Sequence, residues 1–246
     1  MDTTLNDAVN VRDATICIVI PVFNEGSHVE SLVRDLITKG QYDQIIVVDA
    51  STDHASQVEV ARLSTCFPGS QLEVTQSTRP GRAEQMNIGA HHARCDVLLF
   101  LHADTMLPPT AAQDIQGAIK AGHSWGRFDV RLAGESKWFR VIERAMNLRS
   151  AITHIATGDQ AIFVRRDLFV AMGGYASMAI MEDIDLCRRL RLFAKAVRLR
   201  NPVVTSARRW INDGIVYTIL QMWTMRFLFW IGVDASRLAR WYRDSR

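Results

Sequence analysis

Short apolar runs alternate with helical patterns through the first half of this 246-residue chain. The apolar runs lie at residues 15–22, 44–49, 71–76 and 96–101, and helical spacing fills residues 27–38, 53–64 and 81–93. Runs that are apolar on both faces are typical of strands buried in a parallel sheet, joined by helical crossovers. The alternation therefore predicts an α/β fold with a mostly parallel sheet flanked by helices.

The second half of the sequence is less regular. Its pattern predicts a strand at 125–132, a strand and then a helix across 158–174, and helices at 108–121, 136–150, 183–194 and 215–231. Ser27 is a candidate N-cap for the first helix, with Glu30 completing a capping box, and the prolines at 108 and 109 suit a first helical turn. We find no linker and no repeat. We expect a polar tail at residues 1–14, one domain at 15–210 and a C-terminal aromatic and basic helical extension at 211–246.

Composition restricts the class of protein. With 48% hydrophobic and 22% charged residues the chain can bury an ordinary core, and a net charge of +3 without a dense basic tract argues against nucleic-acid binding. The first 14 residues contain no apolar core typical of a signal peptide. The four cysteines form no C-x-x-C motif, and Cys17 and Cys187 are expected to be buried thiols. These features predict a cytoplasmic protein.

Acidic residues follow one apolar run and recur far downstream. The run L-F-L-H-A-D-T stops at His102 and Asp104, and Glu182, Asp183 and Asp185 lie together later in the chain. Ligands bind beyond the carboxyl ends of parallel strands, where a carboxylate can hold a divalent cation against a diphosphate. The two acidic elements therefore suggest metal-assisted transfer from a nucleotide-activated donor.

Other strand ends carry further candidates with simpler alternatives. Asn24 and Glu25 follow the first run and could receive a base or ribose, although turns favour the same residues. Asp49 ends the second run and is the better ligand candidate, because Asp53 has a simpler role as a helix N-cap.

Arginines surround the beginning of the third predicted helix. Arg79 and Arg82 in R-P-G-R could bind a diphosphate with the helix N-terminus, or form only a solvated basic turn. Neither the dinucleotide glycine motif nor the P-loop pattern occurs, which argues against those nucleotide-binding folds.

These motifs, in this order, resemble glycosyltransferase family 2, the inverting nucleotide-sugar transferases of the GT-A fold. The resemblance covers about residues 15–200 and rests on V-I-P-V-F-N-E, V-V-D-A-S-T-D, G-R-A-E-Q-M-N-I-G-A, L-F-L-H-A-D-T, and G-D-Q followed by M-E-D-I-D-L. The combination of G-R-A-x-Q-M-N, H-A-D and S-A-R-R-W resembles one bacterial subgroup of this family.

The resemblance implies a donor site. The donor would be a nucleotide-diphosphate sugar, with Mg²⁺ or Mn²⁺ bound by Asp104 as the last acid of the family's D-x-D motif, and with Arg79 or Arg82 assisting at the diphosphate. The residues implied for the base and ribose pocket are Pro21, Asn24, Glu25 and Asp49.

The resemblance also implies an acceptor side. Asp183 would be the catalytic base that removes a proton from an acceptor hydroxyl of unknown identity. Apart from the resemblance, Glu182, Asp183 and Asp185 have a simpler alternative role as favourable charges at a helix N-terminus, and we assign that role to Asp185. Asp159 and Gln160 would contact the acceptor or the donor sugar, and Trp210 of S-A-R-R-W would border the acceptor.

Two departures from the family pattern affect the donor site. His102 replaces the first acid of D-x-D, where it could ligate the metal through its imidazole or only hydrogen-bond the donor. The usual D-D-G-S is shortened to Asp49-Ala50-Ser51, which removes one carboxylate. An alternative is therefore a catalytically weak nucleotide-sugar-binding protein of the same fold, which Asp104 and Asp183 argue against. A nucleotidyltransferase is disfavoured because residues 23–27 contain no glycine-rich, lysine-containing loop.

The apolar stretch at 215–231 is rich in aromatic residues but contains Arg226. It falls short of the roughly 20 residues that a membrane-spanning helix needs. We interpret it as a helix that packs on the domain, meets a second copy in a homodimer, or lies on a membrane surface. Arg237, Arg240 and Arg243 beyond it would favour anionic lipid at the inner membrane face.

Overall fold

The computed structural model describes residues 13–68 and 70–244. β1 (Ile16–Val22) is central to the N-terminal half of the sheet and pairs in parallel with β2 (Gln44–Asp49) and β4 (Val97–Phe100). β2 pairs in parallel with β3 (Leu72–Gln76). Every residue of β1 is buried, because the strand has neighbours at both edges and helices over both faces. The predicted parallel arrangement is confirmed for these four strands.

The C-terminal half of the sheet is mixed. β7 (Ile162–Arg165) pairs antiparallel with β4 and with β6 (Trp125–Leu132), and β8 (Val197–Thr205) pairs in parallel with β6. The two-residue β5 (Thr105–Met106) pairs antiparallel with β8, which completes the order β3-β2-β1-β4-β7-β6-β8-β5. The fold class is the predicted α/β class, although the pairs that β7 and β5 form are antiparallel.

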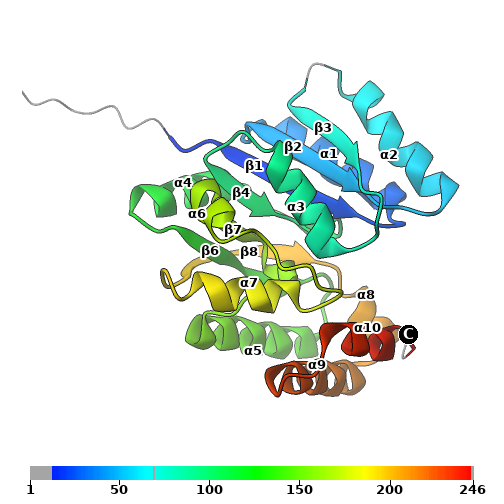
Figure 1. The fold of residues 1–246 in the computed structure, drawn as a ribbon, viewed down its shortest axis with the longest axis vertical. Helices are drawn as coiled ribbons and strands as arrows, with labels where there is room; N and C mark the ends of the chain where they lie inside the picture. Colours follow the sequence, from blue (N-terminus) through cyan, green and yellow to red (C-terminus); the bar gives the residue numbers. More distant parts are fainter. Residues whose placement is uncertain (1–12, 69, 245–246) are drawn as a thin grey trace, which may run out of the picture.

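Helices cover both faces of the sheet (Figure 1). Alternate residues of β1 face opposite ways, so that Ile18 joins one hydrophobic cluster and Val19 the other. The first cluster lies beneath α1 (Gly26–Lys39), α2 (His54–Cys66), α4 (Ala111–Lys120) and α5 (Lys137–Thr153), and the second beneath α3 (Arg82–His92), α6 (Arg166–Ala171) and α7 (Glu182–Leu190).

Three helices form the C-terminal extension, α8 (Arg208–Asn212), α9 (Ile215–Trp230) and α10 (Ala235–Asp244). They gather at the end of the molecule next to α5 (Figure 1). Ile219 and Met222 of α9 pack against the core. Within residues 13–68 and 70–244, no helix combines the length and hydropathy that crossing a membrane would require. The predicted tail lies outside the described residues except for its last two positions.

Several helices and strands begin at residues other than those predicted from the sequence. α1 begins at Gly26, so that Glu25 and not Ser27 occupies the N-cap position, and α4 begins at Ala111, after both prolines. The short 3₁₀ helix η1 (Gly158–Gln160) replaces the start of the strand predicted at 158–165. The predicted N-cap of α2 is confirmed, because the Asp53 carboxylate accepts the Ser56 N–H at 2.7 Å.

Candidate functional site

The loops after β1 and β2 are joined by Asn24. Its backbone has a φ of 55°, a left-handed conformation that asparagine tolerates better than most residues. Its side-chain oxygen accepts the Thr52 N–H at 2.9 Å, and its own N–H donates to Ser51 Oγ at 2.9 Å. Asn24 therefore fixes the shape of both loops while its side chain stays exposed at their surface.

The other residues predicted for the base and ribose pocket differ in exposure. Pro21 is buried within β1, opposite Val48. Asp49 is also buried, and its Oδ1 accepts the Ser51 N–H at 2.9 Å. Glu25 is half-buried, and its carboxylate lies 3.9 Å from the guanidinium of Arg208 in α8. Two of the four candidates thus lie at the surface of the loops and two lie inside the sheet.

Residues of the G-R-A-E-Q-M-N-I-G-A motif in α3 anchor the ends of the strands that lead into these loops. Gln85 is buried and its Nε2 donates to the carbonyls of Val22 at 2.7 Å and Val48 at 2.8 Å, at the ends of β1 and β2. Gly89 allows α3 to lie close to the sheet, since a Cβ there would come within 2.3 Å of Val19 Cγ1. These two motif residues have structural roles.

Asn87, also in α3, binds the segment that leads to α7. Its Nδ2 donates to the Tyr175 carbonyl and its Oδ1 accepts the Tyr175 N–H, both at 2.9 Å. A Cβ at the neighbouring Gly174 would come within 2.6 Å of Asn87 Oδ1. One helix therefore ties the loops of the N-terminal strands to the segment that precedes the downstream acids.

Arg82 at the start of α3 connects the two acidic elements. Its positive charge contributes to lowering the pKa of His102, and it also opposes the rise in the pKa of Glu182. Arg82 is exposed and free to meet a ligand, as is Arg79 in the preceding loop. The structure thus brings Arg82 near residues from both acidic elements.

His102 lies against the backbone of η1. Burial, with a smaller contribution from Arg82, lowers the pKa of His102 to about 3, so the imidazole is neutral near pH 7. A Cβ at Gly158 would lie only 2.4 Å from His102 Nε2, so the glycine makes room for this edge of the ring. The Nε2 edge of His102 therefore lies against the backbone of Gly158.

Asp104 is half-buried between β4 and β5. Its Oδ1 accepts the Thr105 hydroxyl at 3.3 Å, and its backbone carbonyl accepts the Ser206 N–H at 3.2 Å. The S-A-R-R-W segment therefore begins beside Asp104, a proximity produced by the pairing of Thr105 with Thr205.

A metal at Asp104 would have to be shared with a substrate. Among residues 13–68 and 70–244 there is no group of three or more His, Cys, Asp or Glu side chains able to hold a metal ion. Mg²⁺ is commonly bound by one or two carboxylates together with substrate phosphates and water. Asp104, which retains a second oxygen, fits that mode of binding.

Asp183 is oriented by two backbone N–H groups. Its Oδ2 accepts the Gly158 N–H at 2.9 Å, and its Oδ1 accepts the N–H of Ile184 at 2.7 Å. Glu182 beside it is buried, and burial together with the charge of Asp183 raises the pKa of Glu182 to about 7. The preceding Met181 has a φ of 68°, an uncommon conformation for a residue with a side chain. The start of α7 thus brings two acids together at η1.

Asp159 and two arginines complete this region. Burial, and then the charge of Asp183, raise the pKa of Asp159, while Arg149 of α5 and Arg226 of α9 oppose the rise. Burial and the charge of Arg226 lower the pKa of Arg149 to about 10. Four half-buried charged side chains from four elements therefore lie close enough to influence one another's charges, Asp159, Asp183, Arg149 and Arg226.

The two arginines were not among the residues predicted from sequence. Arg226 gave one signal, because it interrupts an otherwise apolar stretch. Arg149 gave none, since a basic residue on a predicted surface helix is ordinary.

Gln160 and Trp210, both predicted to contact an acceptor or sugar, lie inside the protein. Gln160 is fully buried, and its Nε2 donates to Ser150 Oγ at 3.0 Å. Trp210 is buried in the first hydrophobic cluster. Their contacts in the structure are internal, and a contact with substrate stays a prediction for both.

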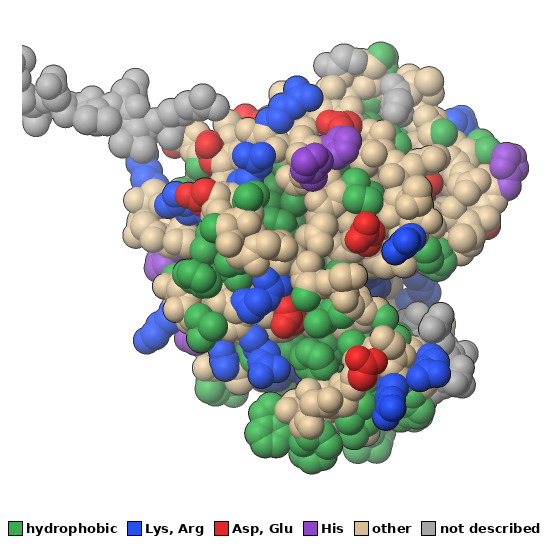
Figure 2. Space-filling model, viewed as in Figure 1, with side chains coloured by type: hydrophobic (Ala, Val, Ile, Leu, Met, Phe, Trp, Pro, Cys, Tyr) green, Lys and Arg blue, Asp and Glu red, His purple; other side chains and the backbone are tan. Residues whose placement is uncertain are grey.

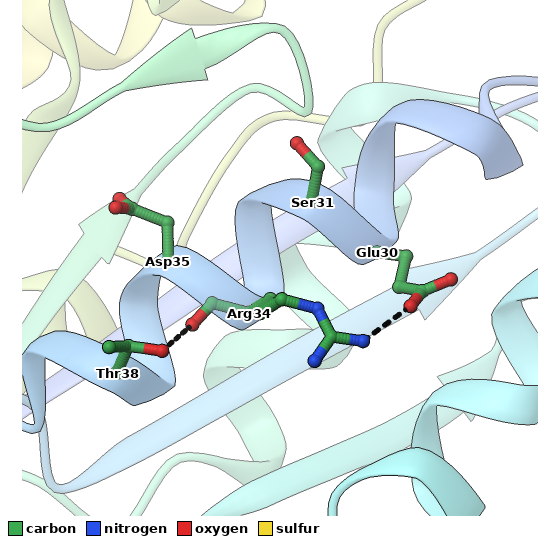
Figure 3. A pocket seen from close by; sticks show the side chains of 5 residues that line it. All are labelled: Glu30, Ser31, Arg34, Asp35 and Thr38. Atoms are coloured by element: carbon green, nitrogen blue, oxygen red, sulfur yellow. Dashed lines mark hydrogen bonds and ion pairs between the residues drawn. The ribbon is translucent and has the colours of Figure 1, made fainter.

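A hollow on the surface of α1 lies apart from these residues. Figure 3 shows the side chains that line it, which include an ion pair of 2.7 Å between Arg34 and Glu30. None of the predicted site residues lines this hollow. Its ion pair is an exposed i,i+4 contact of the kind that solvated helices carry.

Comparison with known families identifies the class of protein to which this fold and site belong. Residues 17–181 match the family model described as glycosyl transferase family 2. The match covers more than half of the chain, and this chain belongs to that family.

Curated relatives agree with this assignment. An uncharacterized glycosyltransferase of Haemophilus influenzae is 24% identical over 213 residues, covering 82% of this chain and 67% of the relative. An uncharacterized glycosyltransferase of Mycobacterium tuberculosis is 27% identical over 195 residues, covering 76% of this chain and 72% of the relative.

Solved structures show the same fold. Staphylococcus aureus TarS 1–349, in complex with UDP-GlcNAc, has a TM-score of 0.60 at 17% identity, covering 78% of this chain but only 58% of that chain. Glucosyl-3-phosphoglycerate synthase from Mycobacterium tuberculosis, in complex with Mn²⁺, UDP and glucosyl-3-phosphoglycerate, has a TM-score of 0.53 at 18% identity, covering 77% of this chain and 70% of that chain. The sheet flanked by helices is the GT-A fold of these neighbours.

Proposed function

We propose that this protein is a cytoplasmic, inverting glycosyltransferase that moves a hexosyl or related sugar from a nucleotide-diphosphate donor to an acceptor hydroxyl, with Mg²⁺ or Mn²⁺ bound at Asp104. The observation that carries the proposal is the contact between Gly158 and Asp183, which joins the G-D-Q motif to the M-E-D-I-D-L motif. Two solved neighbours of the same fold bind UDP-GlcNAc or UDP with Mn²⁺, which supports a nucleotide-sugar donor and a divalent metal.

The proposed donor side is formed by the loops that Asn24 joins. Asn24 and Glu25 are exposed or half-buried there, where they can meet a base or ribose, and Asp49 stiffens the second loop from within. Arg82, and Arg79 in the loop before it, can approach a diphosphate from the α3 N-terminus, where backbone N–H groups also favour anions. The metal on Asp104 would neutralise charge on the leaving diphosphate.

Asp183 has the properties of a general base for the acceptor. Two backbone N–H groups hold its carboxylate in one orientation, and its remaining lone pairs are available to receive a hydroxyl proton. Attack by that oxygen on the face of the sugar opposite the diphosphate inverts the anomeric carbon. Arg226 and Arg149 balance the charges of Asp183 and Asp159 in this enclosed place.

A matched pair of variants tests the proposal. Transfer is measured with a panel of nucleotide sugars and Mn²⁺, and donor affinity is measured separately by calorimetry. We expect Asp183→Asn to lower transfer by about 10²–10⁴-fold with little change in donor affinity, because only the proton acceptor is lost. Asp185→Asn is the control, since Asp185 lies two residues away and pairs with Arg189 at 2.8 Å.

The outcomes separate transfer from binding alone. Equal losses in both variants would show a general effect on α7 and would reject the role of Asp183. Donor binding without transfer or hydrolysis for any donor in the panel would favour the alternative of a nucleotide-sugar-binding protein. The configuration of the product at the anomeric carbon tests inversion.

A further inference from the structure

The outer face of α9 is apolar along the length of the helix. Val216, Leu220, Trp223, Phe227 and Trp230 recur at alternating spacings of four and three residues, which aligns them on one side of a helix. Their exposed fractions range from 57% to 73%. We call these five residues the α9 stripe.

The inner side of the same helix is partly polar. Thr218 and Gln221 are buried, and Gln221 Oε1 accepts a hydrogen bond from Arg209 at 2.7 Å. Arg226 reaches the cluster around Asp159 and Asp183. A helix that covers a core ordinarily buries its apolar side, so packing within the monomer does not account for the α9 stripe. An exposed patch of large apolar residues is typical of a surface that binds something else.

Positive charges border the stripe. Arg237 and Arg240 of α10 are exposed, and α10 packs against α9. α9 itself contains no acidic residue. Figure 2 shows hydrophobic side chains gathered at the end of the molecule where α9 lies, with Lys and Arg side chains beside them.

Two acids lie in the same region. Asp213 lies 3.8 Å from Arg209 and offsets its charge, whereas the exposed Asp234 accepts the Ser236 N–H at 2.9 Å and stays ionised. Arg237 and Arg240 together outweigh Asp234, so the local charge is positive, which suits a negatively charged surface.

We propose that the α9 stripe inserts into the surface of an anionic lipid membrane, with Arg237 and Arg240 of α10 at the level of the headgroups. Tryptophan favours the boundary between lipid and water, and an amphipathic helix with basic flanks lies in the plane of that boundary. A symmetric pair of chains joined through the stripe would bring the same arginines toward each other, which disfavours a dimer at this face. This inference rests on α9 and its flanks and does not depend on the proposed reaction.

Vesicle flotation tests the proposal with the full chain. We expect the protein to float with vesicles of phosphatidylglycerol and phosphatidylcholine, and much less with phosphatidylcholine alone or at high salt. Trp223→Ser with Phe227→Ser should abolish flotation. Arg237→Gln and Arg240→Gln should each weaken binding about fivefold, the equivalent of one headgroup-level charge.

A second exposed apolar pair provides the control. Leu192 and Phe193, which follow α7, are 81% and 66% exposed, so Leu192→Ser with Phe193→Ser removes comparable surface elsewhere. This variant should float like the unchanged protein, and circular dichroism confirms the fold of each variant.

The proposal would be overturned by absence of flotation with anionic vesicles, or by equal loss in the stripe and control variants. If light scattering showed a dimer that dissociates in the stripe variant, and the protein bound no vesicles, the surface would be assigned to a second copy of the chain instead. Because donor binding is measured without vesicles, failure here leaves the proposed reaction testable by itself.

Discussion

The polar residues of the two halves of the sheet differ in what they contact. At the ends of β1 and β2, Asn24, Asp49 and Gln85 are bonded to backbone groups of neighbouring loops and strands. At η1 and α7, Asp159 and Glu182 are enclosed acids whose pKa values are raised by burial and by Asp183. The first group stabilises the framework, whereas the second holds charge in an environment that opposes it. Enclosed and interacting titratable groups are typical of places where chemistry occurs.

Asp104 lies in the segment that links β4 of the N-terminal half to β5 at the edge of the C-terminal half, and its replacement should produce the largest effect. We expect Asp104→Asn to weaken Mn²⁺-dependent nucleotide binding by about 100-fold or more, because even residues that only support metal ligands contribute about 10–100-fold. The midpoint of thermal unfolding without ligand should hardly change. Calorimetric titration of UDP with and without Mn²⁺ measures this effect, and unchanged metal dependence would remove Asp104 from the metal site.

Replacing Gln85 tests whether the polar residues at the ends of β1 and β2 contribute to the stability of the fold. Gln85→Met should lower the free energy of unfolding by about 2 kcal/mol, because the buried Val22 and Val48 carbonyls each lose one hydrogen bond, although the Val22 carbonyl keeps that from the Ala50 N–H. Urea unfolding measures the loss. Glu84→Met on the same helix is the control, since Glu84 is exposed. An equal change in both variants would contradict the framework role.

The pH dependence of stability tests whether burial destabilises Glu182, one of the acids at η1 and α7. Its folded pKa of about 7 exceeds the value of 4.5 for a free side chain, so the folded state binds more protons and stability falls as pH rises from about 4.5 through 7. Glu182→Gln removes this fall. The free energy of unfolding of the variant, relative to that of the unchanged protein, should therefore rise by on the order of 1 kcal/mol when the pH is raised from 5 to 8. Urea unfolding at both pH values measures the gain, and parallel pH profiles would show that Glu182 is not strained by burial.

The sequence allowed much of the N-terminal half to be predicted, because its signals are local. A strand buried on both faces must be apolar along its whole length, so β1, β2, β3 and β4 were predicted within two residues of their bounds. The Asp53 cap was equally visible, since its partner Ser56 is three residues away.

β8 was missed because its signal is not local. Most of its first six residues are exposed or only partly buried, and Pro202 lies where the register with β6 shifts, so the segment does not show the pattern of a central strand. Its existence depends on pairing with β6, about 70 positions earlier in the chain.

The sequence by itself determined the fold class, the family motifs and the apolar character of α9. The tertiary structure alone decided that Gly158 meets Asp183, that the charges of Arg149 and Arg226 act on Asp159, and that the apolar side of α9 faces outward. The physical reason is distance along the chain. Periodicity and capping depend on neighbours within a few residues, whereas burial and charge interactions depend on which distant elements the sheet brings together.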